Sequence, residues 1–158
     1  MNLCPRFIHT LYCDDVRQEV NGKMTFVGAY QGELNVQRAE NTVLPKLCIV
    51  VNVQTPKAQP FDSIFIRVLK DEDVIEETYL PQEIIEAAKT VTPIVGRKYH
   101  TYGLIIELIN LPIEKDCMIR VRARSESEEL ASAALQINLV DNASRPEMFQ
   151  SVRELATN

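Results

Sequence analysis

Long apolar runs are absent from this sequence, and none reaches the roughly 18 residues that a membrane-spanning helix needs. Residues 1–6 also lack the basic start, apolar centre and small-residue cleavage site that together make a secretory signal peptide. We therefore expect a cytoplasmic protein that does not bind a membrane.

The sequence also has fewer basic than acidic residues. The chain carries 17 Lys and Arg residues against 22 Asp and Glu residues, so its net charge is -5 at pH 7. Binding to nucleic acid or to an anionic membrane needs a basic footprint. We therefore do not expect nucleic acid as a partner.

Histidine is scarce, and the motifs of common enzyme classes are missing. His9 and His100 form no H-x-x-x-H or H-x-H pair, so we expect half-buried structural histidines rather than metal ligands. No G-x-S-x-G elbow, phosphate-binding G-x-x-x-x-G-K loop or G-x-G-x-x-G motif is present. We expect a protein that is not an enzyme and that holds no cofactor or metal.

Paired cysteine spacing is also absent. Cys4, Cys13, Cys48 and Cys117 include no C-x-x-C pair, which is typical of free thiols in a reducing compartment. All except Cys4 lie in or beside strand-like runs, where a thiol packs as a small core residue. Cys4 is the cysteine that we expect to be exposed.

What the sequence does contain is a series of short β-rich runs separated by turn signals. With 158 residues, of which 46% are hydrophobic, it suits a single domain with its own core. Strands are expected over 7–13, 16–20, 23–30, 33–37, 47–54, 63–70, 74–80, 99–109, 117–124 and 130–140. This spacing predicts an all-β fold over 1–143, an antiparallel β-sandwich of immunoglobulin-like or C2-like arrangement.

Local signals refine this prediction at three places. Asn21-Gly22 between β-rich runs predicts a type I′ hairpin turn, after which 33–37 continues the pairing. Pro81 predicts a short helix over 82–89, because proline is favoured at the first helical position. Along 117–124 and 130–140, apolar and polar residues alternate, as in strands with one buried face.

The end of the chain, 144–158, has a helical pattern instead. Ser144 and Glu147 have the spacing of a capping box, and an apolar stripe follows at helical spacing, namely Met148, Phe149, Val152, Leu155 and Ala156. This amphipathic helix docks either on its own sandwich or on a second copy or partner, and the sequence leaves both alternatives open.

Asp14-Asp15 is the most prominent polar pair. One interpretation is a calcium site at one end of the sandwich, to which Asp71, Glu72, Asp73, Asp116 and Asp141 from predicted turns contribute. The other is a structural corner in which the carboxylates accept bonds from nearby backbone N–H groups and pair with Arg17 or Lys23.

Three arginines, Arg120, Arg122 and Arg124, share one face of the predicted strand 117–124, and Arg67 is expected on a neighbouring strand. Such a ladder can bind phosphates or an acidic protein surface. Alternatively, it is a solvated face whose arginines pair across the sheet with glutamates such as Glu107.

The stretch from Phe7 to Tyr30 resembles the opening of a family of uncharacterised bacterial proteins that is also met in phage genomes. The shared pattern is an apolar strand, then Cys/Ala-Asp-Asp-Val/Ile-Arg-x-Glu, then Gly-Lys, then an apolar residue followed by Gly-x-Tyr. Here it is carried by Cys13, Asp14, Asp15, Val16, Arg17, Glu19, Gly22, Lys23, Val27, Gly28 and Tyr30. The resemblance implies a small β-sandwich of unknown function and carries over no catalytic residue.

Together these features predict a non-catalytic protein-interaction module whose ligand is a protein partner or a second copy of the chain. Its working surface is expected at Met148, Phe149, Val152 and Leu155, and at the corner of Asp14, Asp15 and Arg17. One alternative is a phage- or prophage-encoded protein, either a virion component or an inhibitor of a host defence protein. Another is a calcium- or anion-dependent binding domain.

Overall fold

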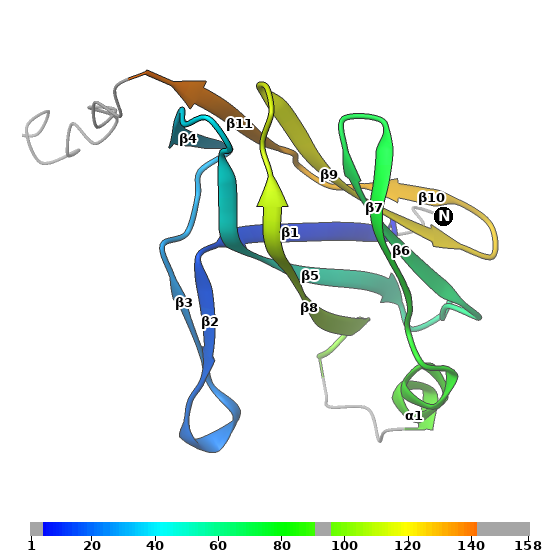
Figure 1. The fold of residues 1–158 in the computed structure, drawn as a ribbon. Coiled ribbons are helices and arrows are strands. Elements are labelled where there is room, and N and C mark those ends of the chain that lie inside the picture. Colours follow the sequence, from blue (N-terminus) through cyan, green and yellow to red (C-terminus); the bar gives the residue numbers. More distant parts are fainter. Residues whose placement is uncertain (1–4, 91–95, 142–158) are drawn as a thin grey trace, which may run out of the picture.

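The computed structural model describes residues 5–90 and 96–141, and these form a β-sandwich with one α-helix (Figure 1). One sheet has the strand order β1-β5-β8, and the other has the order β4-β11-β9-β6-β7 with β10 paired to β9. The strands are β1 (Phe7–Cys13), β2 (Asp15–Gln18), β3 (Met24–Val27), β4 (Glu33–Gln37), β5 (Val43–Pro56), β6 (Ile64–Lys70), β7 (Asp73–Tyr79), β8 (Tyr99–Pro112), β9 (Cys117–Ser125), β10 (Glu129–Ala131) and β11 (Leu135–Val140). The predicted all-β sandwich is confirmed.

The core lies between the two sheets and follows from period-two alternation. On β5, Leu47, Ile49 and Val51 are fully buried. They share one apolar cluster with side chains from the facing strands, namely Ile64, Ile66, Val68, Ile119, Val121, Leu135 and Ile137. Alternate residues of each strand point to opposite faces, so a regular apolar spacing in the sequence is sufficient to build this layer.

The prediction of a single strand over 130–140 is wrong in one respect, because the structure divides this stretch into β10 and β11. β10 pairs with one end of β9 through Leu130 and Ala123, whereas β11 pairs with the other end through Leu135 and Ile119. Between them the chain leaves the ladder, and the carbonyl of Ala133 accepts hydrogen bonds from Thr10 and Tyr12 of β1. The break therefore ties the two sheets together.

β4 forms where it was predicted but pairs differently. It was expected to continue the N-terminal hairpin, yet it pairs in parallel with β11, with Leu34 opposite Ile137. Gly28 and Gly32 have positive φ angles of 64° and 88°, which turn the chain away from β3. Only Tyr30 keeps a single antiparallel bridge to Tyr12.

The hairpin of β2 and β3 extends from the sandwich at lower left in Figure 1. Asn21 and Gly22 have positive φ angles of 67° and 73°, as a type I′ turn requires. The loop is nevertheless longer than predicted. Gln18 lies opposite Met24, so Val20–Gly22 forms a short 3-10 turn rather than a two-residue loop.

The predicted short helix is present as α1 (Gln82–Thr90). The carbonyl of Pro81 accepts hydrogen bonds from Ile84 and Ile85, which starts the first turn. Ile85 is fully buried in the core between the sheets, so α1 closes one end of the sandwich. Within the described ranges, no helix is long and apolar enough to cross a membrane. The predicted helix over 144–158 lies outside the described residues.

Candidate functional site

Asp14 and Asp15 form the corner where β1 ends. Both the backbone N–H and the carboxylate of Asp14 form hydrogen bonds within this corner. The N–H of Asp14 donates to the carbonyl of Val27 at 2.9 Å, and its carboxylate accepts the hydroxyl of Tyr30. Burial, and then the Asp14 carboxylate, raise the pKa of Tyr30. Three residues of the N-terminal sequence pattern, Asp14, Gly28 and Tyr30, thus meet in space, and their contacts are structural.

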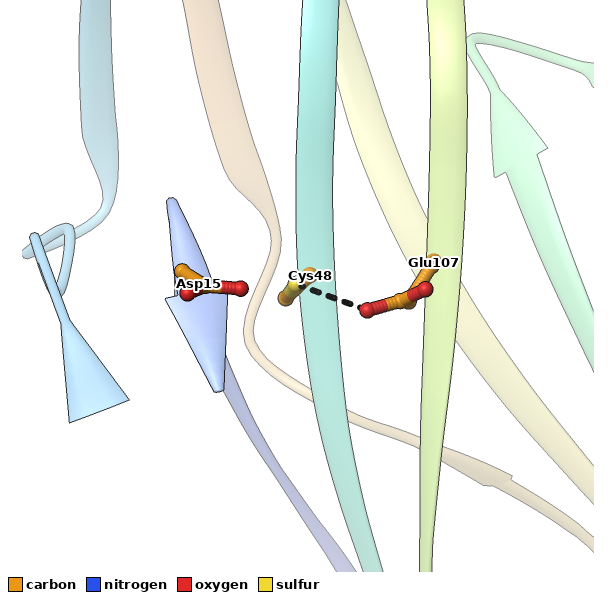
Figure 2. A group of neighbouring side chains, drawn as sticks. All are labelled: Asp15, Cys48 and Glu107. Atoms are coloured by element: carbon orange, nitrogen blue, oxygen red, sulfur yellow. Dashed lines mark hydrogen bonds between the residues drawn. The ribbon is translucent and has the colours of Figure 1, made fainter. Parts of the chain in front are cut away.

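Asp15 belongs to an ion-pair cluster, and its carboxylate lies beside Cys48 and Glu107 (Figure 2). The ammonium of Lys46 lies 2.7 Å from Asp15 Oδ1 and 2.8 Å from Glu107 Oε1, and Arg17 lies 3.4 Å from Asp15 Oδ2. The hydrogen bond from Lys46 lowers the pKa of Asp15, and the two carboxylates raise the pKa of Lys46. Arg17 was expected as a partner of this corner, whereas Lys46 was missed.

The buried thiol of Cys48 completes this cluster. Its Sγ lies 3.8 Å from Glu107 Oε1, and ligand atoms of Cys48, Asp15 and Glu107 lie within 4.8 Å of one another. Among residues 5–90 and 96–141, this is the one group of His, Cys, Asp and Glu that could hold a metal. Burial raises the pKa of Cys48, and Lys46 already forms ion pairs with both carboxylates. A metal would therefore have to displace an ammonium and a proton.

Three of the other acidic residues named for a calcium site have different partners. Asp71 accepts the N–H of Met118 at 3.0 Å, and Asp116 accepts the N–H of Leu139 at 2.8 Å. Asp141 pairs with Arg38 at 3.1 Å. In the described part of the chain, none of the three joins Asp14 or Asp15 in a group able to hold a metal.

The three cysteines expected in the core, Cys13, Cys48 and Cys117, are buried and free. Burial and the neighbouring Cys48 raise the pKa of Cys13 to about 11. Cys4 lies outside the described residues. Of the two histidines, His100 is half-buried as expected, but His9 is exposed because it lies on the outer face of its sheet.

The arginine ladder is present on the outer face of β9, but its partners differ from those expected. Arg120 pairs with Glu72 at 3.1 Å, and Arg124 pairs with Glu129 at 3.5 Å. Arg67 lies directly opposite Arg122, and its own partner is again Glu129 at 2.5 Å. The predicted pairing with Glu107 is wrong, because Glu107 lies on β8 of the other sheet.

Arg6 is a buried cation that sequence reasoning missed. Its side chain is 2% exposed, pairs with Glu126 at 2.6 Å and lies over the ring of Phe61, 4.5 Å from the centroid. It also donates to the hydroxyls of Thr55, Ser125 and Ser127. This network fastens the start of β1 to the β9–β10 turn, so its role is structural. A lone arginine before an apolar strand carries no signal that would reveal it.

A groove along the open side of the sandwich was also missed. It runs between the edge strands β7 and β8 and beside α1, with a volume of about 490 Å³. Its lining combines side chains of β7, Leu80, Pro81, Ile84 and the stretch Gly103 to Glu107 of β8. A smaller hollow of about 200 Å³ shares Glu76 and Glu107 with it and continues along β8 to Pro112. We call both together the edge groove.

Carboxylates dominate the charge around the edge groove. Glu76 and Glu107 line it, and no Lys or Arg residue does. Glu107 is held by Lys46, whereas Glu76 is exposed and forms no ion pair with the residues that the structure describes. The absence of Lys and Arg from 99–112 is the one sequence signal that could have revealed this edge.

Comparison with known proteins adds no assignment. No protein-family model matches this sequence, and no curated protein matches it significantly. The membership in an uncharacterised bacterial family therefore stays a prediction from the residues between Phe7 and Tyr30.

Proposed function

We propose that this protein is a non-catalytic protein-interaction module and that the edge groove is its binding surface. The observation that carries this proposal is the position of β8, a strand of 14 residues at the edge of its sheet, beside a groove that apolar side chains help to line. An edge strand has one row of backbone N–H and C=O groups without a partner strand. These groups and an adjoining groove are what strand-type peptide recognition requires.

β8 lacks the features by which proteins protect such edges. Folded proteins blunt an edge with Lys residues, with proline, with bulges or with short strands. Apart from the terminal Pro112, β8 contains none of these residues. Its one carboxylate, Glu107, is paired with Lys46, and Ile109 is 57% exposed on it. An edge of this length and apolar character aggregates unless it has a function or a cover.

The other edges of the two sheets are less open. β7 carries Asp73, Glu76 and Glu77, and its pairing with β6 shifts register between Val68 and Leu69. On β1, the hydroxyls of Thr10 and Tyr12 donate to the carbonyl of Ala133, and Tyr12 also forms a backbone bridge to Tyr30. β4 has five residues, Glu33–Gln37. Among the strands that the structure describes, the unprotected edge is therefore β8.

A photo-crosslinking experiment in the producing cells tests this function. A photoreactive amino acid replaces Ile109 in one variant and Val20 in the control, because both side chains are exposed and apolar but only Ile109 lies on β8. We expect a discrete protein adduct at position 109 and none at position 20. An adduct with a second copy of the chain would identify the partner as self.

Two results would contradict the proposal. If neither position forms an adduct, β8 has no partner protein. If both positions form the same adducts with equal yield, the contact is non-specific and not a function of the edge.

The C-terminal residues 144–158 remain a proposed second contact, with Met148, Phe149, Val152 and Leu155 as its apolar stripe. Removal of the chain from Ser144 onwards tests it. Loss of the adduct at position 109, with unchanged thermal stability, would support a role in binding. An unchanged adduct would remove these residues from the binding surface. A phage origin and a cytoplasmic location stay predictions from the sequence.

A further inference from the structure

We infer that the edge groove binds an extended, basic segment of a partner protein, which pairs with β8 and places a Lys or Arg side chain against Glu76. This inference rests on the proposed function and adds the chemistry of the partner. It follows from the charges at the groove, from its apolar lining and from the strand that borders it.

The first argument is charge. Glu76 lines both parts of the edge groove, is exposed and forms no ion pair within the described part of the chain. A Lys or Arg side chain close to this carboxylate gains Coulomb energy in a groove that partly excludes water.

Basic residues around the groove already have partners, and Lys70 of β6 donates to the carbonyl of Pro112 at 2.7 Å. Lys46 is held between Asp15 and Glu107. Lys89 of α1 pairs with Glu86 at 2.9 Å and with Asp62 at 3.5 Å. The groove therefore keeps an uncompensated carboxylate, and a basic ligand complements it whereas a phosphate-bearing one is repelled.

The second argument is the lining. Leu104 and Ile106 of β8 and Ile84 of α1 line the groove beside Glu76. Ile84 is 49% exposed, so part of this apolar surface is left in water. Because successive side chains of an extended chain point to opposite sides, a bound strand can turn alternate residues toward these apolar side chains. A ligand with alternating apolar and polar residues is therefore favoured.

The third argument concerns the alternative that a second copy occupies the groove. Two copies related by a two-fold axis would pair β8 with β8, and each would bring Glu76 and Glu107 but no basic lining residue. Like charges brought together across a strand pair are destabilising. The charges thus favour a basic partner over self-association at this edge.

A peptide selection with the full chain tests the inference. Random decapeptides displayed on phage are selected against the wild-type protein, and enriched sequences are synthesised. We expect alternating apolar residues with Lys or Arg. Binding of the synthetic peptide, followed by fluorescence anisotropy, should weaken about tenfold in Glu76→Lys, because attraction becomes repulsion.

Glu33→Lys is the matched control. Glu33 is exposed and forms no described ion pair, and it lies on β4, at the opposite edge of the same sheet from β7. Glu33→Lys changes the net charge by the same amount as Glu76→Lys. If the effect of Glu76→Lys is local, the affinity of the Glu33→Lys variant for the peptide should stay within about twofold of wild type. Hydrogen exchange should also slow at β8 amides when the peptide binds.

Three results would overturn the inference. These are enriched peptides that are neutral or acidic, equal losses of affinity in Glu76→Lys and Glu33→Lys, and an absence of any enriched peptide. A different result would contradict the proposed function. A specific adduct at position 109 with a non-basic protein segment would keep the interaction module and reject the basic ligand, whereas no adduct there would reject the module itself.

Discussion

Gly28 packs closely against Asp14 at the corner where β1 ends. It has a φ of +64°, and a Cβ atom there would lie 2.7 Å from Cγ of Asp14. The carboxylate of Asp14 is held in that place by the hydroxyl of Tyr30. A side chain at position 28 therefore conflicts with both the backbone and the Asp14–Tyr30 bond.

Gly28→Ala should destabilise the protein more than Gly22→Ala does. Gly22 has a similar φ of +73° but no atom within 4 Å of an added Cβ, so it reports backbone strain alone. We expect about 1 kcal/mol for Gly22→Ala and about 2–4 kcal/mol for Gly28→Ala, measured by urea unfolding. Equal losses in the two variants would show that the contact with Asp14 has no energetic role.

Arg6 gives a second prediction at the scale of one residue. Arg6→Ala leaves Glu126 and the buried hydroxyls of Thr55 and Ser125 without their donor, so we expect a loss of about 3 kcal/mol in the free energy of unfolding. Arg6→Lys should recover only part of the lost stability, because one ammonium cannot form all the hydrogen bonds of a planar guanidinium.

Arg38→Ala is the control, because Arg38 and Asp141 form an exposed pair whose side chains are 53% and 87% exposed. Such pairs contribute less than about 1 kcal/mol. A loss in Arg6→Ala no larger than that of the control would contradict the structural role of Arg6.

At the scale of elements, α1 illustrates how a short helix gains stability from packing. Nine residues are too few for an isolated helix to be stable in water, so Gln82–Thr90 depends on its contact with the core. Ile85 makes that contact with no exposed surface, whereas its neighbour Ile84 faces the edge groove.

Ile85→Ala should therefore cost about 2–5 kcal/mol and Ile84→Ala less than about 1 kcal/mol, as measured by thermal or urea unfolding. The two substitutions remove the same atoms from adjacent positions, so the change in intrinsic helix propensity is the same in both and cancels in the comparison. A similar loss in both variants would mean that α1 is not anchored through Ile85.

At the scale of the whole molecule, the low-pH limit of stability should depend on paired carboxylates. The hydrogen bond from Lys46 lowers the pKa of Asp15. Burial raises the pKa of Glu126, but hydrogen bonds from backbone N–H groups and from Arg6 outweigh it, and the net pKa is lowered. These groups bind protons less readily in the folded state than in the unfolded state.

The contribution of such groups is fully present above their ordinary pKa values, about 3.9 for Asp and 4.3 for Glu, and is lost as the pH falls through the lower values of the folded state. Stability should therefore decrease between about pH 5 and pH 3. Urea unfolding across that range should give a shallower decrease for Asp15→Asn than for wild type, and Glu33→Gln should retain the wild-type slope. An unchanged slope in Asp15→Asn would contradict the role of Lys46.

The sequence by itself determined the local structure of this protein. Strands β1, β4, β6, β7 and β9 lie within about two residues of their predicted ranges, because period-two alternation acts locally along the chain. The short helix and the positive φ angles of Asn21 and Gly22 were likewise predictable from Pro81 and from Asn-Gly.

Tertiary structure alone decided which elements and side chains meet. The parallel pairing of β4 with β11, the break at Ala133 and the burial of Arg6 all depend on contacts between residues more than 45 positions apart. The edge groove is a further case, since whether a strand lies inside a sheet or at its edge depends on the partners of the whole chain. Local pattern specifies which face of a strand is buried, and only the assembled fold specifies which edge is left open.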